Sequence, residues 1–392
     1  MSGPMRAFLI VLDSAGIGGA LDADEFGDEG ANTIGHIAGA VPALRLPALA
    51  SLGLGQALEA ASGLSVPRLT AEPAGRWAAA TEVSRGKDTP SGHWELAGVP
   101  VPWDWHYFPN EVPAIPQDIL SAIAEAAGSD GTLCNAHASG IPVIAEHGEA
   151  HLRTGRPIVY TSVDSVVQIA AHEEAFGLDR LLATCEAVAP MLHAMRVGRV
   201  IARPFLGAPG AFERTTNRRD FAMDPPSPTL LDWAHGAGRA TYGVGKIKDI
   251  FAGRGVSDAR KGADADLMAH LDDIAAEAPD GSLIFANLVE FDTLYGHQRD
   301  PEGYARALVR FDAWLARFLP GLREGDLLIV TADHGNDPTW RGTDHTRERV
   351  PVLMHGAGAG PLSDGHCAFA DVGATVADHL GLTERGAGRS LL

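Results

Sequence analysis

The segment LLIVTADHGND, residues 327–337, contains the pattern that decides the fold of this chain. Its first five residues are apolar or β-branched, as is typical of a buried parallel strand, and they lead into Asp333 and His334. Ligand sites in open α/β sheets form at the carboxyl ends of such strands. The segment therefore predicts a strand that delivers a carboxylate and an imidazole to one edge of a sheet.

Two other apolar runs are followed by the same kinds of side chain: Asp13 comes just after residues 6–12, and Asp292 and His297 come soon after residues 282–289. A further His-containing segment lies at residues 342–356. Carboxylates and imidazoles together bind divalent cations. Six such side chains are enough for two ions with positions left open, and paired ions suit the transfer of phosphate. Any one segment alone fits an ordinary cap or core residue equally well. The candidate metal ligands are Asp13, Asp292, His297, Asp333, His334 and His345.

Apolar runs alternate with Ala-rich stretches along the rest of the chain. Helices are predicted at residues 301–319 and from near Asp371, which we expect to be an N-cap. Strand–helix alternation predicts an α/β fold, a doubly wound parallel sheet with helices on both faces. The strands are expected at residues 6–12, 158–161, 199–202, 240–244, 282–289 and 326–331.

The stretch between the two Pro-rich segments 101–116 and 223–229 differs in character. Both segments, VPWDWHYFPNEVPAIP and MDPPSPT, are rich in structure breakers and are typical of hinges. We therefore expect a discontinuous metal-binding core, residues 1–103 and 229–392, with a smaller α/β cap domain, residues 104–228, inserted into it. Such a cap would close over the site and keep water out during transfer.

The net charge of −19 over 392 residues disfavours nucleic acid and anionic membranes as partners, because the overall field repels them. Only four lysines are present, so arginine is expected to supply local positive charge for an anionic substrate. The basic segment ERTTNRRD, residues 213–220, is a candidate anion collector, although a solvated loop explains it as well. Three distant cysteines and a short N-terminal apolar run indicate a cytoplasmic protein. No obligate protein partner is inferred.

The candidate nucleophile lies in SRGKDTPSGHWELAGVPV, residues 84–101. A Thr or Ser near a helix start lies at the positive end of the helix dipole, which suits a group that carries phosphate. The alternative is an ordinary capping turn built on Asp88 or Ser91.

Seven segments together resemble the phosphopentomutase family of the alkaline phosphatase superfamily. The resemblance runs from near residue 7 to the C-terminus, and its most specific part is GKDT…GHWE, residues 86–95. The motif TADHGND followed by DHTRE also resembles a motif of cofactor-independent phosphoglycerate mutases. The NSEVGH-like motif of those mutases is absent from this sequence. The segments are DSAGIG (13–18), GKDTPSGHWELAGVPV (86–101), YTSVDSVVQIAAHEE (160–174), GRVIARPFLG (198–207), YGVGKIKDIFAGRG (242–255), NLVEFDTLYGHQRD (287–300) and TADHGNDPTWRGTDHTRERVPVLMHG (331–356).

The resemblance implies a role for each matching residue. Thr89 matches the threonine that becomes phosphorylated. Asp13, Asp333 and His334 match the ligands of one manganese ion, and Asp292, His297 and His345 match those of a second. The sequence departs from the family at Ser91, where the family has threonine. Serine keeps the hydroxyl at this position, and the nucleophile is the earlier residue Thr89, which is unchanged. Substrate contacts are implied for Asp164, Arg203 and Lys246.

The function that the resemblance implies is an isomerase that interconverts (deoxy)ribose 1-phosphate and (deoxy)ribose 5-phosphate. The route runs through a phosphothreonine and a bisphosphorylated sugar, with a glucose 1,6-bisphosphate-type activator, in nucleoside salvage and pentose phosphate metabolism. Two alternatives stay open: a hydrolase or another mutase on the same core, since a fold does not fix a function, and a non-catalytic metal-binding protein.

Overall fold

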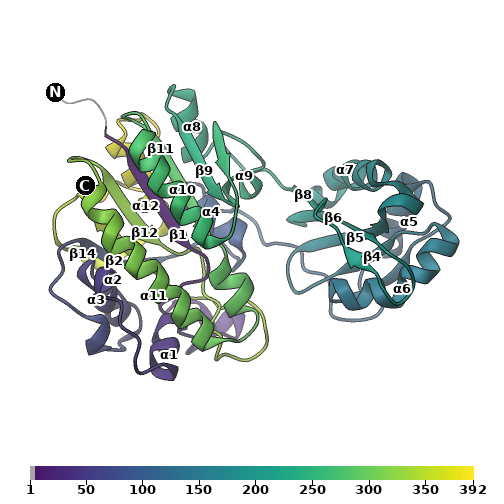
Figure 1. Ribbon diagram of the computed structural model, residues 1–392, viewed down its shortest axis with the longest axis horizontal. Coiled ribbons are helices and arrows are strands. Elements are labelled where there is room, and N and C mark those ends of the chain that lie inside the picture. The colour runs from purple at the N-terminus through teal and green to yellow at the C-terminus, as the bar shows by residue number, and fades with distance from the viewer. Residues whose placement is uncertain (1–4) are drawn as a thin grey trace. The chain divides into compact units, whose positions relative to one another are not determined.

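The computed structural model describes residues 5–392, which form two compact units (Figure 1). The core unit comprises the chain up to Pro102 and from Pro225 to Leu392, and the inserted unit comprises Trp103–Asp224. Among the described residues, no helix combines the length and apolar character needed to cross a membrane.

The core unit contains one eight-stranded sheet with helices packed against it. Its strands are β1 (Ala7–Leu12), β2 (Arg76–Thr81), β9 (Thr241–Gly245), β10 (Asp258–Arg260), β11 (Leu283–Leu288), β12 (Leu327–Thr331), β13 (Val350–His355) and β14 (Gly360–Ala368). Its helices are α1 (Thr33–Ala40), α2 (Pro47–Ser51), α3 (Leu54–Ser62), α4 (Thr89–Leu96), α8 (Leu230–Gly236), α9 (Ile247–Ile250), α10 (Asp264–Glu277), α11 (Pro301–Phe318) and α12 (Phe369–His379). Single helical turns lie at Ala23–Phe26, Pro67–Leu69, Phe291–Gly296 and Leu319–Gly321.

The strand order is β10-β9-β11-β1-β12-β13-β2-β14, and only β13 runs antiparallel to its neighbours. The central strand β1 is completely buried, as its uninterrupted apolar sequence AFLIVL predicts for a sheet covered on both faces. Helices α10 and α11 lie in front of the strands in the view of Figure 1, and α12 packs on β1 and β14. The doubly wound α/β core expected from the sequence is therefore confirmed.

The inserted unit is a smaller α/β structure with its own six-stranded sheet and its own apolar core. Its sheet has the order β3-β4-β5-β6-β7, with β8 paired to β6, and α7 packs on β5 and β6. The elements are α5 (Gln117–Ala127), β3 (Leu133–His137), α6 (Gly140–Thr154), β4 (Ile158–Thr161), β5 (Val166–His172), a helical turn at Glu173–Gly177, α7 (Leu178–Ala194), β6 (Arg199–Leu206), β7 (Glu213–Arg214) and β8 (Arg219–Ala222).

All six strands expected from apolar runs are present, and their ends agree with the expected ones within a residue or two. The exception is β6, which continues to Leu206, four residues beyond the expected end at residue 202. The expectation that Asp371 caps α12 as its N-cap is wrong, because α12 begins at Phe369. Asp371 lies in the first turn, where its carboxylate accepts a hydrogen bond from Ala368 N at 3.0 Å. This is the reach-back half of a capping box, which places an acidic residue three positions after the cap.

Candidate active site

Three neighbouring parallel strands deliver the three predicted aspartates to one edge of the core sheet. β11, β1 and β12 are adjacent and in register, with Leu12 paired to Leu288 and Val11 paired to Thr331. Asp13 follows β1 directly, and Asp333 and Asp292 follow the two flanking strands. All three carboxylates are buried, with at most 5% of each residue exposed. The antiparallel strand β13 starts at the same edge, so the loop before it carries His345 to this point.

The imidazoles of the three predicted histidine ligands are oriented by backbone carbonyls. In each one Nδ1 donates a hydrogen bond to a carbonyl oxygen, which fixes the tautomer and leaves Nε2 as the coordinating nitrogen. Metal-binding histidines in proteins are held in this way. The pairs are His297 with Thr343 O at 2.7 Å, His334 with Gly335 O at 3.1 Å, and His345 with Lys87 O at 2.8 Å.

Asp13, Asp333 and His334 offer ligand atoms that all lie within 4.8 Å of one another. His334 Nε2 is 3.2 Å from Asp333 Oδ2 and 3.5 Å from Asp13 Oδ1. Two ligands that each stand about 2.1 Å from one ion are separated by roughly 3.0–3.4 Å, so this spacing fits a shared cation. Within residues 5–392, Asp13 Oδ1 and Asp333 Oδ2 have no hydrogen-bond partner although both are buried. These two oxygens are positioned to bind a cation.

A second group of ligand atoms adjoins the first and consists of Asp292, His334 and His345. His345 Nε2 lies 3.4 Å from Asp292 Oδ1, and His297 Nε2 lies 3.2 Å from Asp292 Oδ2. The rings of His334 and His345 stack with their centroids 4.0 Å apart. The structure thus brings all six predicted ligands together, and their donor chemistry fits two divalent cations.

Backbone and side-chain amides that the sequence reasoning missed orient each carboxylate. One oxygen of each aspartate accepts a hydrogen bond from a buried donor. In Asp13 and Asp333 the second oxygen faces His334, whereas in Asp292 both oxygens lie near a histidine, Oδ1 near His345 and Oδ2 near His297. Asn287 is the donor with the clearest sequence signal, since it is a buried amide within the otherwise apolar strand β11. The pairs are Asn287 Nδ2 with Asp13 Oδ2 at 3.1 Å, Ser14 N with Asp333 Oδ1 at 3.0 Å, and Asn336 Nδ2 with Asp292 Oδ1 at 2.7 Å.

The electrostatics of the cluster also favour a cation. Burial, together with the negative charges of Asp333 and Asp292, raises the pKa of Asp13 to about 6. Burial would also raise the pKa of Asp333, but the neighbouring His334 and His93 outweigh it and hold that pKa below its ordinary value. A divalent cation beside Asp13 would favour its ionised form, because an opposite charge in contact stabilises a carboxylate.

Thr89 is the first residue of α4, with Asp88 at the N-cap position. Its Oγ1 lies 3.3 Å from His334 Nε2, so the hydroxyl faces the first group of candidate ligands. The helix dipole places positive potential at this position, which favours a phosphate on the threonine. The hydroxyl, the helix terminus and the ligand cluster thus meet at one point.

Buried side chains hold the loop that leads to Thr89. Arg347, only 2% exposed, donates to the carbonyl oxygens of Glu82 at 2.9 Å and Gly86 at 2.6 Å. The carboxylate of Glu95 accepts hydrogen bonds from the backbone amide of Ser84 at 2.7 Å and from its hydroxyl at 2.5 Å. The loop is therefore fixed from both sides, which limits the positions that Thr89 can take.

Two lysines adjoin the ligand cluster. Lys87 forms ion pairs with Asp28 at 3.0 Å and Asp344 at 3.2 Å, so it is not a freely solvated side chain. Lys246 directly follows β9 at the N-cap position of α9, and its positive charge offsets a small part of the rise in the pKa of Asp13 that burial and Asp333 cause. Lys246 therefore contributes positive charge at the same sheet edge.

The other two predicted substrate contacts, Asp164 and Arg203, belong to the inserted unit. Asp164 lies between β4 and β5, with its carboxylate 3.7 Å from Arg199. Arg203 lies on β6 and donates from Nε to Gln168 Oε1 at 3.0 Å. Burial, and then the nearby charge of Arg218, lower the pKa of Arg203 to about 10.

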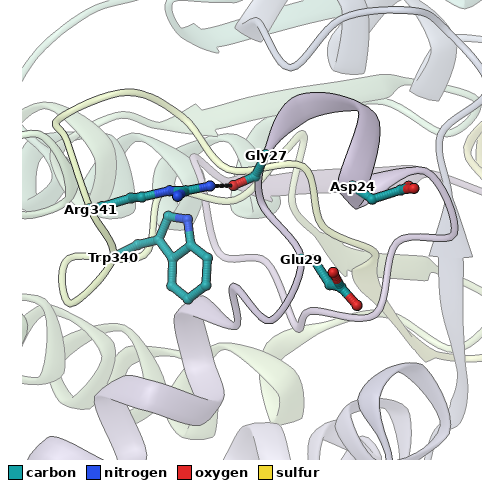
Figure 2. A pocket seen from close by; sticks show the side chains of 5 residues that line it. All are labelled: Asp24, Gly27, Glu29, Trp340 and Arg341. Carbon is teal, nitrogen blue, oxygen red and sulfur yellow. Dashed lines mark hydrogen bonds between the residues drawn. The ribbon is translucent and has the colours of Figure 1, made fainter.

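An open cavity of about 410 Å³ lies elsewhere in the core unit (Figure 2). Arg341 donates a hydrogen bond to Gly27 O across it. None of the predicted site residues lines this cavity, and its exposed carboxylates would repel a phosphate. The lining residues are Asp24, Gly27, Glu29, Trp340 and Arg341.

Comparison with known proteins identifies relatives along nearly the whole chain. Residues 5–384 match the model of the metalloenzyme superfamily. The phosphopentomutase of Chromohalobacter salexigens is 54% identical, with 99% of this chain and 96% of the relative covered. The phosphopentomutase of a Chelativorans species is 55% identical, with 96% of each chain covered.

Among solved structures, the phosphoglycerate mutase of Leishmania mexicana has the same fold, with a TM-score of 0.50 and 12% identity over 100% of this chain and 98% of that one. At this identity the likeness concerns the fold alone. The sequence relatives share more than half of their residues with this chain over almost their full length. The chain belongs to the phosphopentomutase family, a family of isomerases within the metalloenzyme superfamily.

Proposed function

We propose that this enzyme interconverts (deoxy)ribose 1-phosphate and (deoxy)ribose 5-phosphate through a phosphothreonine at Thr89. The observation that carries the proposal is the 3.3 Å separation between Thr89 Oγ1 and His334 Nε2, inside a cluster of six candidate metal ligands. The names of relatives that are 54–55% identical support the same reaction.

The candidate ligands would hold two divalent cations, which we propose to be manganese, as the family resemblance implies; a set of imidazole and carboxylate donors accommodates this ion. When bound, such ions neutralise phosphate oxygens and make a hydroxyl more nucleophilic. The proposed sets are Asp13, Asp333 and His334 for one ion, whose ligand atoms lie close together, and Asp292, His297 and His345 for the other. Support for the second set is that His345 Nε2 and His297 Nε2 lie 3.4 Å and 3.2 Å from the Asp292 carboxylate.

Phosphoryl transfer then proceeds between Thr89 and the sugar. The free hydroxyl oxygen of the sugar phosphate attacks the phosphorus of phosphothreonine and the bond from phosphorus to Thr89 Oγ1 breaks. In the net reaction the hydroxyl proton passes to Thr89 Oγ1, so that a bisphosphorylated sugar and a free threonine hydroxyl form. The other phosphate of this sugar returns to Thr89 Oγ1 in the reverse sense. The loop held by Arg347 and Glu95 keeps the threonine in place in both steps, and the N-terminus of α4 stabilises the charge that the phosphate carries.

Substrate recognition is proposed for Asp164, Arg203 and Lys246. Support for Arg203 comes from its surroundings in the inserted unit, where Arg214 and Arg218 add positive charge that disfavours its protonated form. A phosphate dianion would relieve this repulsion and match the guanidinium fork. Such contacts would use binding energy to hold the sugar while water is excluded.

The proposed setting is nucleoside salvage and pentose phosphate metabolism in the cytoplasm, with a glucose 1,6-bisphosphate-type sugar as the activator that first loads Thr89. The free thiols of Cys134, Cys185 and Cys367 support a reducing compartment. Small pentose phosphates are the proposed partners, without nucleic acid, membrane or obligate protein partner.

The test is a coupled assay of ribose 5-phosphate formation from ribose 1-phosphate, with manganese and glucose 1,6-bisphosphate. Wild-type enzyme should be active and carry phosphate on Thr89 by mass spectrometry. Thr89→Ala should retain metal and fold but lose several orders of magnitude in kcat, because the covalent nucleophile is gone. Phosphate found only elsewhere, or an active variant, would refute the role of Thr89. Release of inorganic phosphate as the main product would identify a hydrolase instead.

A further inference from the structure

His93 connects the candidate nucleophile with a candidate metal ligand. It lies on α4, four residues after Thr89, and is completely buried. Its Nδ1 donates a hydrogen bond to Thr89 O at 2.9 Å and stands 3.1 Å from Asp333 Oδ2. One nitrogen therefore contacts both the backbone of the nucleophile residue and the carboxylate that lies beside its hydroxyl.

The orientation of this imidazole is fixed. Its ring stacks on Phe285 of β11, with centroids 5.9 Å apart and planes 23° apart. Because Nδ1 bonds to a carbonyl oxygen, Nδ1 carries the proton. In the described part of the chain, Nε2 has no hydrogen-bond partner although it is buried. A side chain that only filled the core would not need a polar ring here, since an unpaired buried nitrogen is costly.

The preceding glycine allows the close approach that this contact requires. A Cβ on Gly92 would lie 2.1 Å from Asp333 O, well inside van der Waals contact. Helix α4 therefore packs directly against the backbone of Asp333. Gly92 and His93 together determine how far the first turn of α4 stands from the end of β12.

We propose that His93 is a positioning residue that couples the orientation of Asp333 to the position of Thr89. The proposal rests on the function proposed above. Its Nδ1–H is hydrogen-bonded to Thr89 O and so holds the first turn of α4. The same nitrogen lies 3.1 Å from Asp333 Oδ2, where the partial positive charge of the N–H attracts that carboxylate. Partners of metal ligands in this position typically change metal affinity or activity by 10–100-fold when they are replaced.

The test compares three replacements at this position. His93→Phe keeps the ring that stacks on Phe285 but removes the donor. His93→Asn places an amide N–H close to the position of Nδ1, whereas His93→Gln places it near Nε2. His379→Phe is the matched control, because His379 Nε2 also donates to a core carbonyl, Arg6 O at 3.2 Å, but at the other end of β1. Each chelated protein is titrated with manganese, and Thr89 phosphate and the kinetic constants are measured.

We expect His93→Phe and His93→Gln to bind one of two manganese ions about 10–100-fold more weakly, with the other ion unchanged. Both should lower kcat and the phosphate on Thr89 with little change in KM, and His93→Asn should recover most of each loss. His379→Phe should match wild type in manganese binding. Should His93→Phe fail to fold, the comparison of Gln with Asn decides the question.

Wild-type manganese affinity and kcat in a folded His93→Phe or His93→Gln would overturn the proposal. So would a folded His93→Asn that recovers neither property, because the donor at Nδ1 would then be irrelevant. The manganese titration reports on His93 and Asp333 even if wild-type enzyme shows no mutase activity. Failure of this inference is therefore distinguishable from failure of the proposed function.

Discussion

Replacing Arg6 with Met should destabilise the core strongly without affecting catalysis. Arg6 lies just before β1 and is completely buried. Its guanidinium binds Asp326 through Nη2 to Oδ2 at 2.5 Å and through Nε to Oδ1 at 3.2 Å, and Nη1 donates to Ala275 O at 2.5 Å. The pair joins the amino ends of β1 and β12, whereas Asp13 lies at the carboxyl end, roughly 20 Å away along the strand.

The magnitude follows from what the substitution leaves behind. Asp326 is only 2% exposed and would keep one backbone hydrogen bond, from Arg323 N at 2.9 Å. Breaking a buried ion pair by removing one partner costs about 3–5 kcal/mol, a large share of the usual 5–15 kcal/mol of domain stability. Arg6→Met/Asp326→Leu should recover most of this loss, because apolar residues of similar volume replace buried pairs at little cost.

Urea denaturation of the metal-loaded proteins, followed by near-UV circular dichroism, measures the effect. The matched control is Arg306→Met, since Arg306 is 62% exposed and its ion pair with Glu302 is 3.7 Å long. That variant should stay within about 1 kcal/mol of wild type. A loss below about 1 kcal/mol in Arg6→Met, or no recovery in the double variant, would refute the argument from burial. A reduced kcat in fully folded Arg6→Met would refute the claim that the amino end of β1 does not influence the candidate active site.

Three further predictions concern the metals, the substrate and pH. Elemental analysis of His297→Ala should find about one ion where wild type holds about two, and equal metal content would contradict the proposed ligand set. Arg203→Ala should raise KM at least tenfold in the mutase assay, because a charge-assisted contact to phosphate is lost, and an unchanged KM would remove Arg203 from the substrate site. Stability should fall as the pH drops below 6.5, because burial lowers the folded-state pKa of His151 while the unfolded chain still takes up a proton near its ordinary pKa of 6.5. The contribution of His151 to stability is complete above pH 6.5 and is lost as the pH falls toward the pKa of the folded state. His151→Asn should therefore show a smaller difference than wild type between the urea midpoints measured at about pH 7.5 and about pH 5.5.

The sequence by itself determined which kinds of side chain end the central strands. An apolar run can be recognised from its composition, and an Asp within the few residues after such a run lies close to a strand end whichever strands are its neighbours. For this reason Asp13, Asp292 and Asp333 could be proposed as one group. Sequence reasoning locates a helix start only to within a few residues, as the wrong prediction of Asp371 as an N-cap illustrates. An Asp near a helix start fits either the N-cap position or the third helical position, which Asp371 occupies.

The sequence pattern could not supply the strand order or the supporting contacts. Strands β11, β1 and β12 are adjacent although they are far apart in the chain, and this order arises from helix packing and crossover connections. Asn287, Asn336 and His93 gave no decisive signal, because a single Asn or His in a motif has many structural explanations.

Only the tertiary structure decided which nitrogen of each histidine faces the cluster and how α4 approaches the sheet. Those properties depend on carbonyls that come from other segments, such as Lys87 O beside His345 and Thr343 O beside His297. They also depend on Gly92, whose missing side chain lets the helix touch Asp333. Local sequence sets the type of each ligand, but orientation is set by contacts between residues distant in the chain, which form only when the sheet is assembled.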